Sequence, residues 1–303
     1  MADYLVKSVA GNEMFRAYAV SATGVVAEAQ RRHDTWSAAS AALGRSLVGT
    51  LLLASSVLKG EEQMTVKING NGPVGGIVVD GNAKGTVKGY LQHPHVHLPL
   101  NDKHKIDVKA AVGTDGFLSV TKDQGVGDPF TGTVALVSGE LGEDFTYYLA
   151  QSEQIPSAVG LSVFVNDDNS IGVAGGFLVQ VLPNATDEAI SSLENKLKDM
   201  PLVSQLMRDG KSPEDILDLL FDGDVKVLDK MPVKFECDCS KERFAEALMA
   251  LPKHEVQAMI DEDHGATAVC HFCGDQYQFS ERELEAVLSR SKVTLNESRV
   301  ADR

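Results

Sequence analysis

Residues 36–59 read WSAASAALGRSLVGTLLLASSVLK, a stretch dominated by Ala and Leu. Either Asp34 or Thr35 can cap the start of a helix, and Gly60 is a common helix stop. The longest apolar run lies within residues 47–58, about half of the roughly 20 residues that a membrane-spanning helix needs. We therefore predict a long helix that is largely buried in a globular domain and does not enter a membrane.

Short runs rich in β-branched residues surround this helix and are separated by Gly and Asn, which is typical of antiparallel strands joined by tight turns. The runs are residues 64–69, 76–79, 86–91, 117–122, 132–137 and 161–165. We interpret them as one continuing meander. Because helices do not alternate regularly with the strands, the pattern favours an α+β fold over a doubly wound parallel sheet. Residues 1–182 are expected to form this N-terminal α+β core domain of antiparallel sheet and helix.

Helical periodicity begins after Pro183. Thr186 can cap a first helix, and Ser212, which precedes a proline, marks the start of a second one. The second helix has one apolar face, formed by Ile216, Leu217, Leu219 and Leu220. We predict a helical linker domain over residues 183–230.

A third unit is expected over residues 231–303. A strand-like stretch, residues 225–235, leads into its first cysteines, and Ser240 can cap the helix that follows. Ser280 and Glu283 have the spacing of a capping box, which predicts a last helix. We therefore expect a small C-terminal domain of mixed secondary structure.

The charge of the chain argues against nucleic acid as a partner. The formal net charge is −15, and residues 231–303 alone carry nine Lys and Arg against 14 Asp and Glu. Binding to nucleic acid normally depends on Lys and Arg that displace counterions from the phosphates. We predict no nucleic-acid partner for the whole chain or for its C-terminal unit.

The N-terminus and the cysteines indicate a reducing compartment. The first residues, MADYLVK, lack the basic patch, apolar core and cleavage site of a secretory signal. All four cysteines of the 303-residue chain lie in its last quarter. A permanent disulfide framework is disfavoured in the cytosol, so metal binding or redox chemistry is the better explanation. We expect a cytoplasmic protein.

The cysteines form two short pairs, Cys237-Asp-Cys239 and Cys270-His-Phe-Cys273, with 30 residues between the pairs. This is the pattern of a four-thiolate zinc site, because Zn²⁺ accepts four thiolates in a tetrahedron. Gly274 directly follows the second pair and permits the tight backbone of a zinc knuckle. We predict that Cys237, Cys239, Cys270 and Cys273 bind one Zn²⁺ per chain.

Such a site would couple folding to thiol chemistry. A unit of this size buries little apolar surface, and structural zinc contributes about 10–16 kcal/mol in small domains. Whole domains are stable by only about 5–15 kcal/mol, so oxidation of the thiolates would unfold the unit. A purely architectural zinc site remains an alternative at this point.

Three other sequence patterns are weaker indications of a functional site. Cys270-x-x-Cys273 could be the active site of a thiol oxidoreductase, but the supporting βαβ context is missing. Residues 70–75, GNGPVG, match a dinucleotide fingerprint, yet a strand follows where a helix is required, which favours a turn between antiparallel strands. His93, His95 and His97 could share the face of a strand and bind a metal, but the prolines around them make a loop equally plausible, and we assign them no role.

With the cysteine pairs at this separation and position, the chain resembles the bacterial redox-regulated heat-shock chaperone family, the 33-kDa chaperonins. Further similarity lies in the stretches GPVGG at 72–76, GTVKGY at 85–90, FTG at 130–132 and SEQIPSA at 152–158. The resemblance covers nearly the whole chain.

The resemblance implies an ATP-independent holdase, not an enzyme, that binds unfolding client proteins and prevents their aggregation under oxidative stress. The reduced, zinc-bound form would be inactive. Oxidation would release zinc and form disulfides that pair Cys237 with Cys239 and Cys270 with Cys273. The family picture adds that the linker then loosens and that the active, oxidised form is a homodimer.

Overall fold

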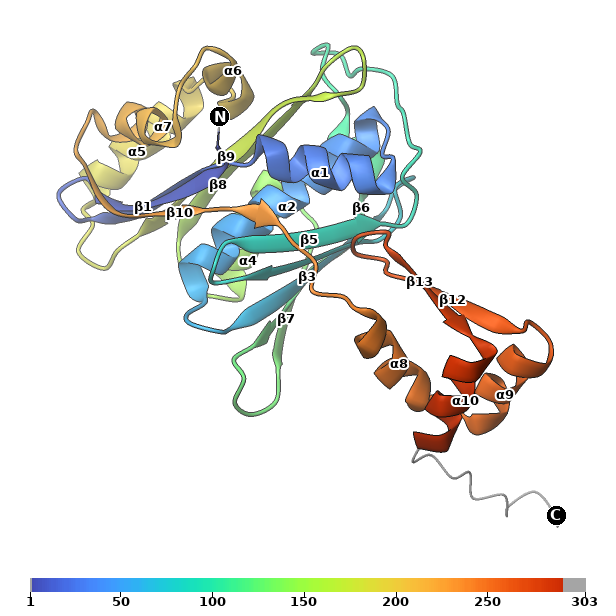
Figure 1. Cartoon of the computed structure of the whole chain (residues 1–303). Coiled ribbons are helices and arrows are strands. Elements are labelled where there is room, and N and C mark those ends of the chain that lie inside the picture. Colours follow the sequence, from blue (N-terminus) through green and yellow to red (C-terminus); the bar gives the residue numbers. More distant parts are fainter. Residues whose placement is uncertain (1, 291–303) are drawn as a thin grey trace, which may run out of the picture. The chain divides into compact units, whose positions relative to one another are not determined.

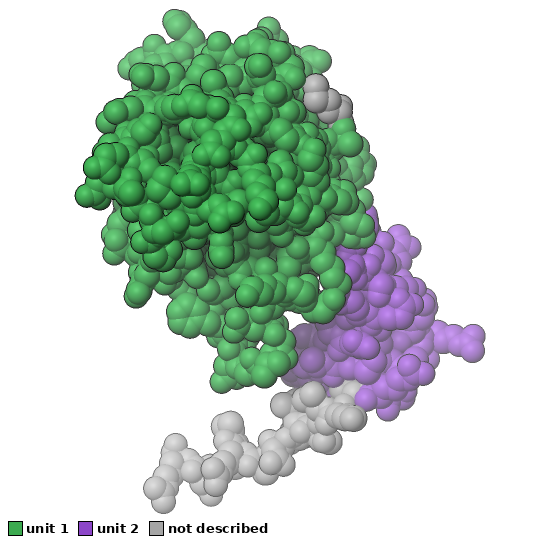
Figure 2. Space-filling model, turned by 90° about the vertical axis from the view of Figure 1, so that its left-hand side faces the viewer, with its two compact units in different colours: residues 1–236 green, residues 237–303 purple. Residues whose placement is uncertain are grey.

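The structure is a computed structural model that describes residues 2–290. The chain divides into two compact units, residues 1–236 and residues 237–303, which Figure 2 shows in green and purple. Helices and strands mix in both units (Figure 1). The predicted α+β class is confirmed.

Helix α2 (Ser37–Val57) is the predicted long helix, and it is buried along most of its length. It contacts strands of both large sheets of the first unit, so both of its faces are covered. By length and composition α2 could cross a membrane, but 89% of its apolar window is buried inside the protein. The prediction of a buried helix is confirmed.

The predicted caps of α2 are wrong. Trp36 occupies the N-cap position without a side-chain hydrogen bond. Asp34, in the left-handed conformation, ends the preceding helix α1 (Thr23–His33), which the sequence did not reveal. The hydroxyl of Thr35 lies 2.7 Å from that of Ser40 and is buried. The helix ends at Val57, three residues before the predicted glycine stop.

A six-stranded sheet, in the order β11-β5-β4-β3-β6-β7, packs against α2. All of its neighbouring strands are antiparallel except β11 and β5, which run parallel. The strands are β3 (Gln63–Asn71), β4 (Ile77–Asn82), β5 (Thr86–Leu91), β6 (Gly113–Asp123), β7 (Phe130–Ala135) and β11 (Lys234–Phe235). Residues 72–76 connect antiparallel β3 and β4, so the predicted turn at the GNGPVG stretch is confirmed.

A five-stranded antiparallel sheet, in the order β10-β1-β2-β9-β8, contributes to two cores. Its strands are β1 (Tyr4–Ala10), β2 (Phe15–Ser21), β8 (Ser157–Val165), β9 (Ile171–Val181) and β10 (Val225–Pro232). The run at 161–165 was expected to continue the meander, but β8 belongs to this second sheet and pairs with β9. The short helices α3 (Val108–Val112) and α4 (Gly142–Gln151) complete the part of the chain before residue 183.

Three helices pack on the second face of the five-stranded sheet: α5 (Asp187–Asp199), α6 (Val203–Arg208) and α7 (Pro213–Phe221). Thr186 caps α5 and Ser212 caps α7, as predicted. Leu219, which was placed on the apolar face of α7, is instead 49% exposed. The helices share their core with strands of the same unit, and the division of residues 1–236 into a core domain and a linker domain remains a prediction.

Over residues 237–290, the second unit combines a hairpin with three helices. Its elements are α8 (Lys241–Met249), α9 (Lys253–Asp261), β12 (Gly265–Val269), β13 (Gln276–Ser280) and α10 (Glu281–Arg290). Ser240 caps α8, and the carboxylate of Glu283 accepts hydrogen bonds from the amide and hydroxyl of Ser280, as the sequence predicted. The core of this unit has five buried side chains among the described residues: Val256, Ile260, Phe279, Leu284 and Val287.

Candidate metal centre

Two loops of the second unit carry the four cysteines. Cys237 and Cys239 lie in the segment between β11 and α8, and Cys270 directly follows β12. Cys273 lies in the turn that connects β12 with β13. The β12–β13 hairpin and the segment before α8 therefore supply one pair each.

The second pair sits in a tight turn that the backbone holds closed. The amide of Gly274 donates to the carbonyl of Cys270 at 2.7 Å, and the amide of Cys270 donates to the carbonyl of Asp275 at 2.9 Å. Gly274 has φ +78°, a conformation that a side chain would strain. The glycine expected after Cys273 is therefore required by the backbone of the turn.

The four sulfur atoms converge, all lying within 4.8 Å of one another. Sγ of Cys237 is 3.7 Å from Sγ of Cys270, and Sγ of Cys239 is 3.3 Å from Sγ of Cys273. A disulfide would require about 2.05 Å, so all four are free thiols. Tetrahedral zinc with sulfurs at about 2.3 Å implies sulfur-to-sulfur separations of about 3.8 Å. The donor set and its spacing fit a four-thiolate metal ion.

The thiols influence each other's ionisation. Burial raises the pKa of Cys237 to about 11, and hydrogen bonding among neighbouring sulfurs contributes to the increase. Burial also raises the pKa of Cys273. For Cys239, burial opposes ionisation, but hydrogen bonds from Tyr277 and Cys273 outweigh it and lower the pKa. Without a cation, four neighbouring sulfurs do not all ionise together, whereas a bound divalent cation would favour four thiolates.

Tyr277 on β13 is a member of this site that the sequence analysis missed. Its hydroxyl lies 3.2 Å from Sγ of Cys239 and 3.1 Å from the carbonyl oxygen of the same residue. Its ring packs against Phe244 of α8, with centroids 5.2 Å apart. The alternation of Tyr277 and Phe279 along β13 was the available signal, because it places both rings on one face of the strand.

The histidine run is a loop and does not form a cluster. Nε2 of His95 lies 2.9 Å from the carboxylate of Asp34, and Nδ1 of His97 lies 2.7 Å from the hydroxyl of Ser37. Over residues 2–290, the four cysteines are the one group of metal-ligating side chains that converges. The histidines carry no site in this conformation.

Comparison with known proteins identifies the family. A family model described as Hsp33 protein matches residues 3–280 of the chain. The chain belongs to the Hsp33 family. Among Hsp33 relatives, the 33 kDa chaperonin of Levilactobacillus brevis is 67% identical over 294 residues, which cover 97% of this chain and 100% of that protein. The 33 kDa chaperonin of Limosilactobacillus fermentum is 67% identical over 292 residues, covering 95% and 99%.

A solved Hsp33 structure has the same fold. The crystal structure of the 33 kDa chaperonin from Thermotoga maritima aligns with a TM-score of 0.89 at 37% identity, covering 95% of this chain and 98% of that one. The resemblance to the 33-kDa chaperonins is thereby confirmed. Membership in the Hsp33 family supports a chaperone function, and a group of four close cysteines that could bind a metal ion is consistent with this family.

Proposed function

We propose that this chain is a redox-regulated, ATP-independent holdase of the cytoplasm that binds unfolding proteins under oxidative stress. Its reduced, zinc-bound form is inactive, and it has no catalytic role. The observation that carries the proposal is the convergence of four thiols, within 4.8 Å, in a unit whose apolar core has five buried side chains over residues 237–290. Order in this unit and the oxidation state of its sulfurs are therefore linked.

The proposed ligands of one Zn²⁺ per chain are Cys237, Cys239, Cys270 and Cys273. Four sulfur donors suit zinc and make a closed, structural type of site. When bound, zinc would hold the sulfurs as thiolates and cross-link the loop before α8 to the β12–β13 turn. The hydroxyl of Tyr277 lies where it can donate to the Cys239 sulfur and stabilise its negative charge.

Loss of this cross-link would unfold the second unit. Structural zinc contributes about 10–16 kcal/mol in small domains. A domain is stable by about 5–15 kcal/mol in total, so the remaining apolar core would not keep the unit folded. Oxidation of the thiolates thus has a large structural effect although the chemistry is confined to four atoms.

The redox step consumes an oxidant such as hydrogen peroxide. Four thiolates give up four electrons as two sulfur–sulfur bonds form, and two peroxide molecules take up these electrons and four protons to give four water molecules. We propose the pairs Cys237–Cys239 and Cys270–Cys273, following the family resemblance. The contacts at 3.7 Å and 3.3 Å join sulfurs of opposite pairs, so crossed disulfides are the competing product, and they would hold the two segments together.

We propose that the linker helices of the first unit, α5 to α7, loosen next and expose apolar surface to clients. Helix α5 has a single buried residue, Leu193. Segments with few buried contacts open at low free energy. Following the family resemblance, we propose that the active, oxidised form is a homodimer.

The experiment starts from reduced, zinc-loaded protein. Peroxide treatment should release about one zinc per chain, measured with a chromophoric chelator. In step with that release, the protein should suppress light scattering by a denaturant-unfolded test protein without ATP. Peptide mass spectrometry should find the two local disulfides, and light scattering after size exclusion should find a dimer. Zinc release without suppression of aggregation would reduce the site to an architectural one.

A further inference from the structure

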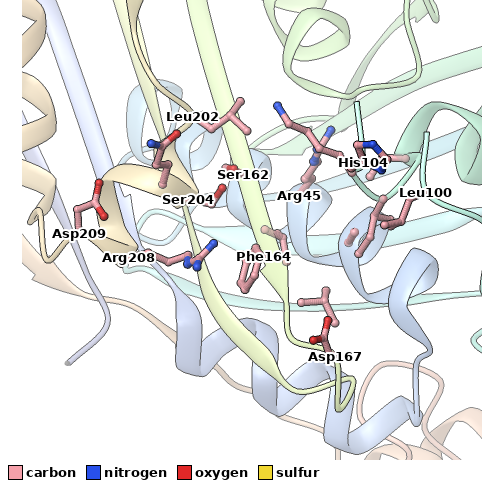
Figure 3. A pocket seen from close by; sticks show the side chains of 17 residues that line it. Arg45, Leu100, His104, Ser162, Phe164, Asp167, Leu202, Ser204, Arg208 and Asp209 are labelled. Carbon is pink, nitrogen blue, oxygen red and sulfur yellow. The ribbon is translucent and has the colours of Figure 1, made fainter. Parts of the chain in front are cut away.

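A cavity of about 510 Å³ lies within the first unit, beside helix α6. Strand β8, helix α2 and the loop that precedes α3 supply its other walls (Figure 3). This volume falls within the range of about 300–1,000 Å³ that is typical of small-molecule sites. None of its lining residues belongs to the cysteine unit, so a ligand here would bind separately from the metal centre.

Two serines of the lining are largely buried, and their hydroxyls lack a protein partner among the described residues. Ser162 on β8 is 5% exposed and Ser204 on α6 is 7% exposed. Within residues 2–290, neither hydroxyl makes a hydrogen bond to another protein group. Neither oxygen is fully enclosed by the protein, so both can be reached from the cavity. A hydroxyl that faces a cavity and has no protein partner normally meets a water molecule or a ligand there. Both hydroxyls therefore point to a polar occupant of the cavity.

Positive charge adds to these hydroxyls. The guanidinium of Arg208 stacks on the ring of Phe164 at 4.1 Å, and no described carboxylate pairs with it. On α2, Arg45 is held by Glu140 through Nη1, while its buried Nε has no partner. The two acidic residues of the lining, Asp167 and Asp209, are exposed, and so is Arg208. The lining holds three cationic side chains, of Arg45, Lys105 and Arg208, against these two carboxylates. The positive groups stand out on a chain with a formal net charge of −15.

The remaining walls are largely apolar. Leu100 and Ile106 come from the loop before α3, and Leu202 precedes α6. In the view of Figure 3, Leu100 and His104 lie on the opposite side from Ser204 and Arg208. A purely inorganic ion would leave these apolar walls without contacts, whereas a purely apolar molecule would leave the hydroxyls unpaired. The lining suits a molecule that has both properties.

We propose that this cavity binds a small organic anion with an apolar body. The anionic oxygens accept hydrogen bonds from Ser162, Ser204 and Arg208, and the apolar body packs on Leu100 and Ile106. Carboxylates and phosphate monoesters share this head-group chemistry. Because the lining includes both β8 and α6, the bound anion also fastens α6 to the sheet.

The binding experiment uses the reduced, zinc-loaded full chain and isothermal titration calorimetry. The probes are decanoate and phenyl phosphate, with inorganic phosphate as the head group alone and decanol as the body alone. At least one amphipathic anion should bind 1:1 with a Kd below about 1 mM, which corresponds to a binding free energy of about −4 kcal/mol or better. Phosphate and decanol should each bind at least about tenfold more weakly.

The variant Arg208→Gln should weaken binding by roughly 10-fold to 100-fold, the usual effect of losing a hydrogen bond to a charged group. Ser204→Ala, which removes one neutral hydrogen bond, should weaken it by roughly fivefold. Arg16→Gln is the matched control, because Arg16 is an exposed arginine on β2 away from the cavity lining. It should bind like the wild type.

Hydrogen exchange gives an independent readout that needs no variant. With decanoate at ten times its Kd, amides of α6 that exchange by local opening should slow about 11-fold, and amides of the second unit should not change. The proposal is overturned if neither amphipathic anion binds, if decanol binds as tightly as decanoate, if Ser204→Ala and Arg208→Gln both bind like the wild type, or if α6 gains no protection. The site would then hold only water.

Discussion

The variant Leu217→Ala should open the helical segment of the first unit without any oxidant. Leu217 on α7 is 0% exposed and belongs to the core between the helices and the five-stranded sheet. The change removes three carbon atoms, worth about 2.4 kcal/mol at about 0.8 kcal/mol each. The cavity left behind raises the cost to roughly 2–5 kcal/mol. At 1.4 kcal/mol per factor of ten, the open form of the segment becomes about 30-fold to several thousand-fold more populated.

Leu219→Ala on the same helix is the matched control. Leu219 is 49% exposed, so its truncation should change stability by no more than about 0.5 kcal/mol. The two variants differ in burial, whereas the chemical change and the helix are the same. A difference in stability between the two variants therefore reports the loss of the core contact of Leu217 and not a change in the helix propensity of α7.

Hydrogen exchange followed by mass spectrometry measures the opening directly, in reduced and zinc-loaded protein. Peptides from α5 to α7 should lose protection in Leu217→Ala, while peptides from α2 and the cysteine unit keep theirs. The same sample should suppress aggregation of an unfolded test protein while its four thiols stay reduced. If α5 to α7 lose protection and aggregation is not suppressed, the proposed role of the linker is wrong. If protection is lost uniformly across residues 1–236, the segment does not open as a separate unit.

Three further predictions concern other parts of the chain. Cys270→Ser should lower zinc affinity strongly and remove the protection of residues 237–290 even under reducing conditions, and an unchanged affinity in a chelator competition would contradict the ligand assignment. Glu153→Ala leaves the largely buried ammonium of Lys122 without its partner at 2.8 Å and should cost about 3–5 kcal/mol in urea unfolding, whereas Glu61→Ala at an exposed pair should cost at most about 1 kcal/mol. Hydrogen bonds, of which that from Arg31 contributes most, lower the pKa of Glu28 to about 2. The stability that the ionised Glu28 contributes is complete above about pH 4.5 and is lost as the pH falls towards 2. Wild type and Glu28→Gln should therefore converge in stability across that interval, by less than about 1 kcal/mol because Glu28 lies at the surface.

The fold class followed from patterns that are local in the chain. The apolar run of α2 and the separate runs of β3, β4 and β5 have a periodicity that each segment carries by itself. Strand β2 was missed because residues on both of its faces are buried, which removes the alternation that marks a strand. Strand β8 was recognised as a strand but assigned to the wrong sheet, because strand pairing depends on residues distant in sequence and a single run of β-branched side chains does not specify its partner.

The candidate metal centre was predictable to the level of the four sulfurs and no further. The spacing within each cysteine pair and the position of Gly274 could be recognised in the sequence, because both are features of a local turn. Tyr277 was not, since its contact with Cys239 spans 38 positions and depends on how β13 meets the loop before α8. The capping errors at Asp34 and Thr35 have a related cause, because a helix ends directly before α2 and uses the residue that appeared free to begin the next one.

The two-sided burial of α2 has a consequence for synthesis on the ribosome. One of its faces is covered by β4 and β5, which are made soon after it, but the other packs against β8 and β9, which end at Val181. More than a hundred residues must be translated between the end of α2 and its second cover. During this interval the nascent helix displays a Leu-rich surface on which Arg45 is the one charged side chain, a condition that favours aggregation. A member of a chaperone family thus itself passes through an aggregation-prone stage during its synthesis.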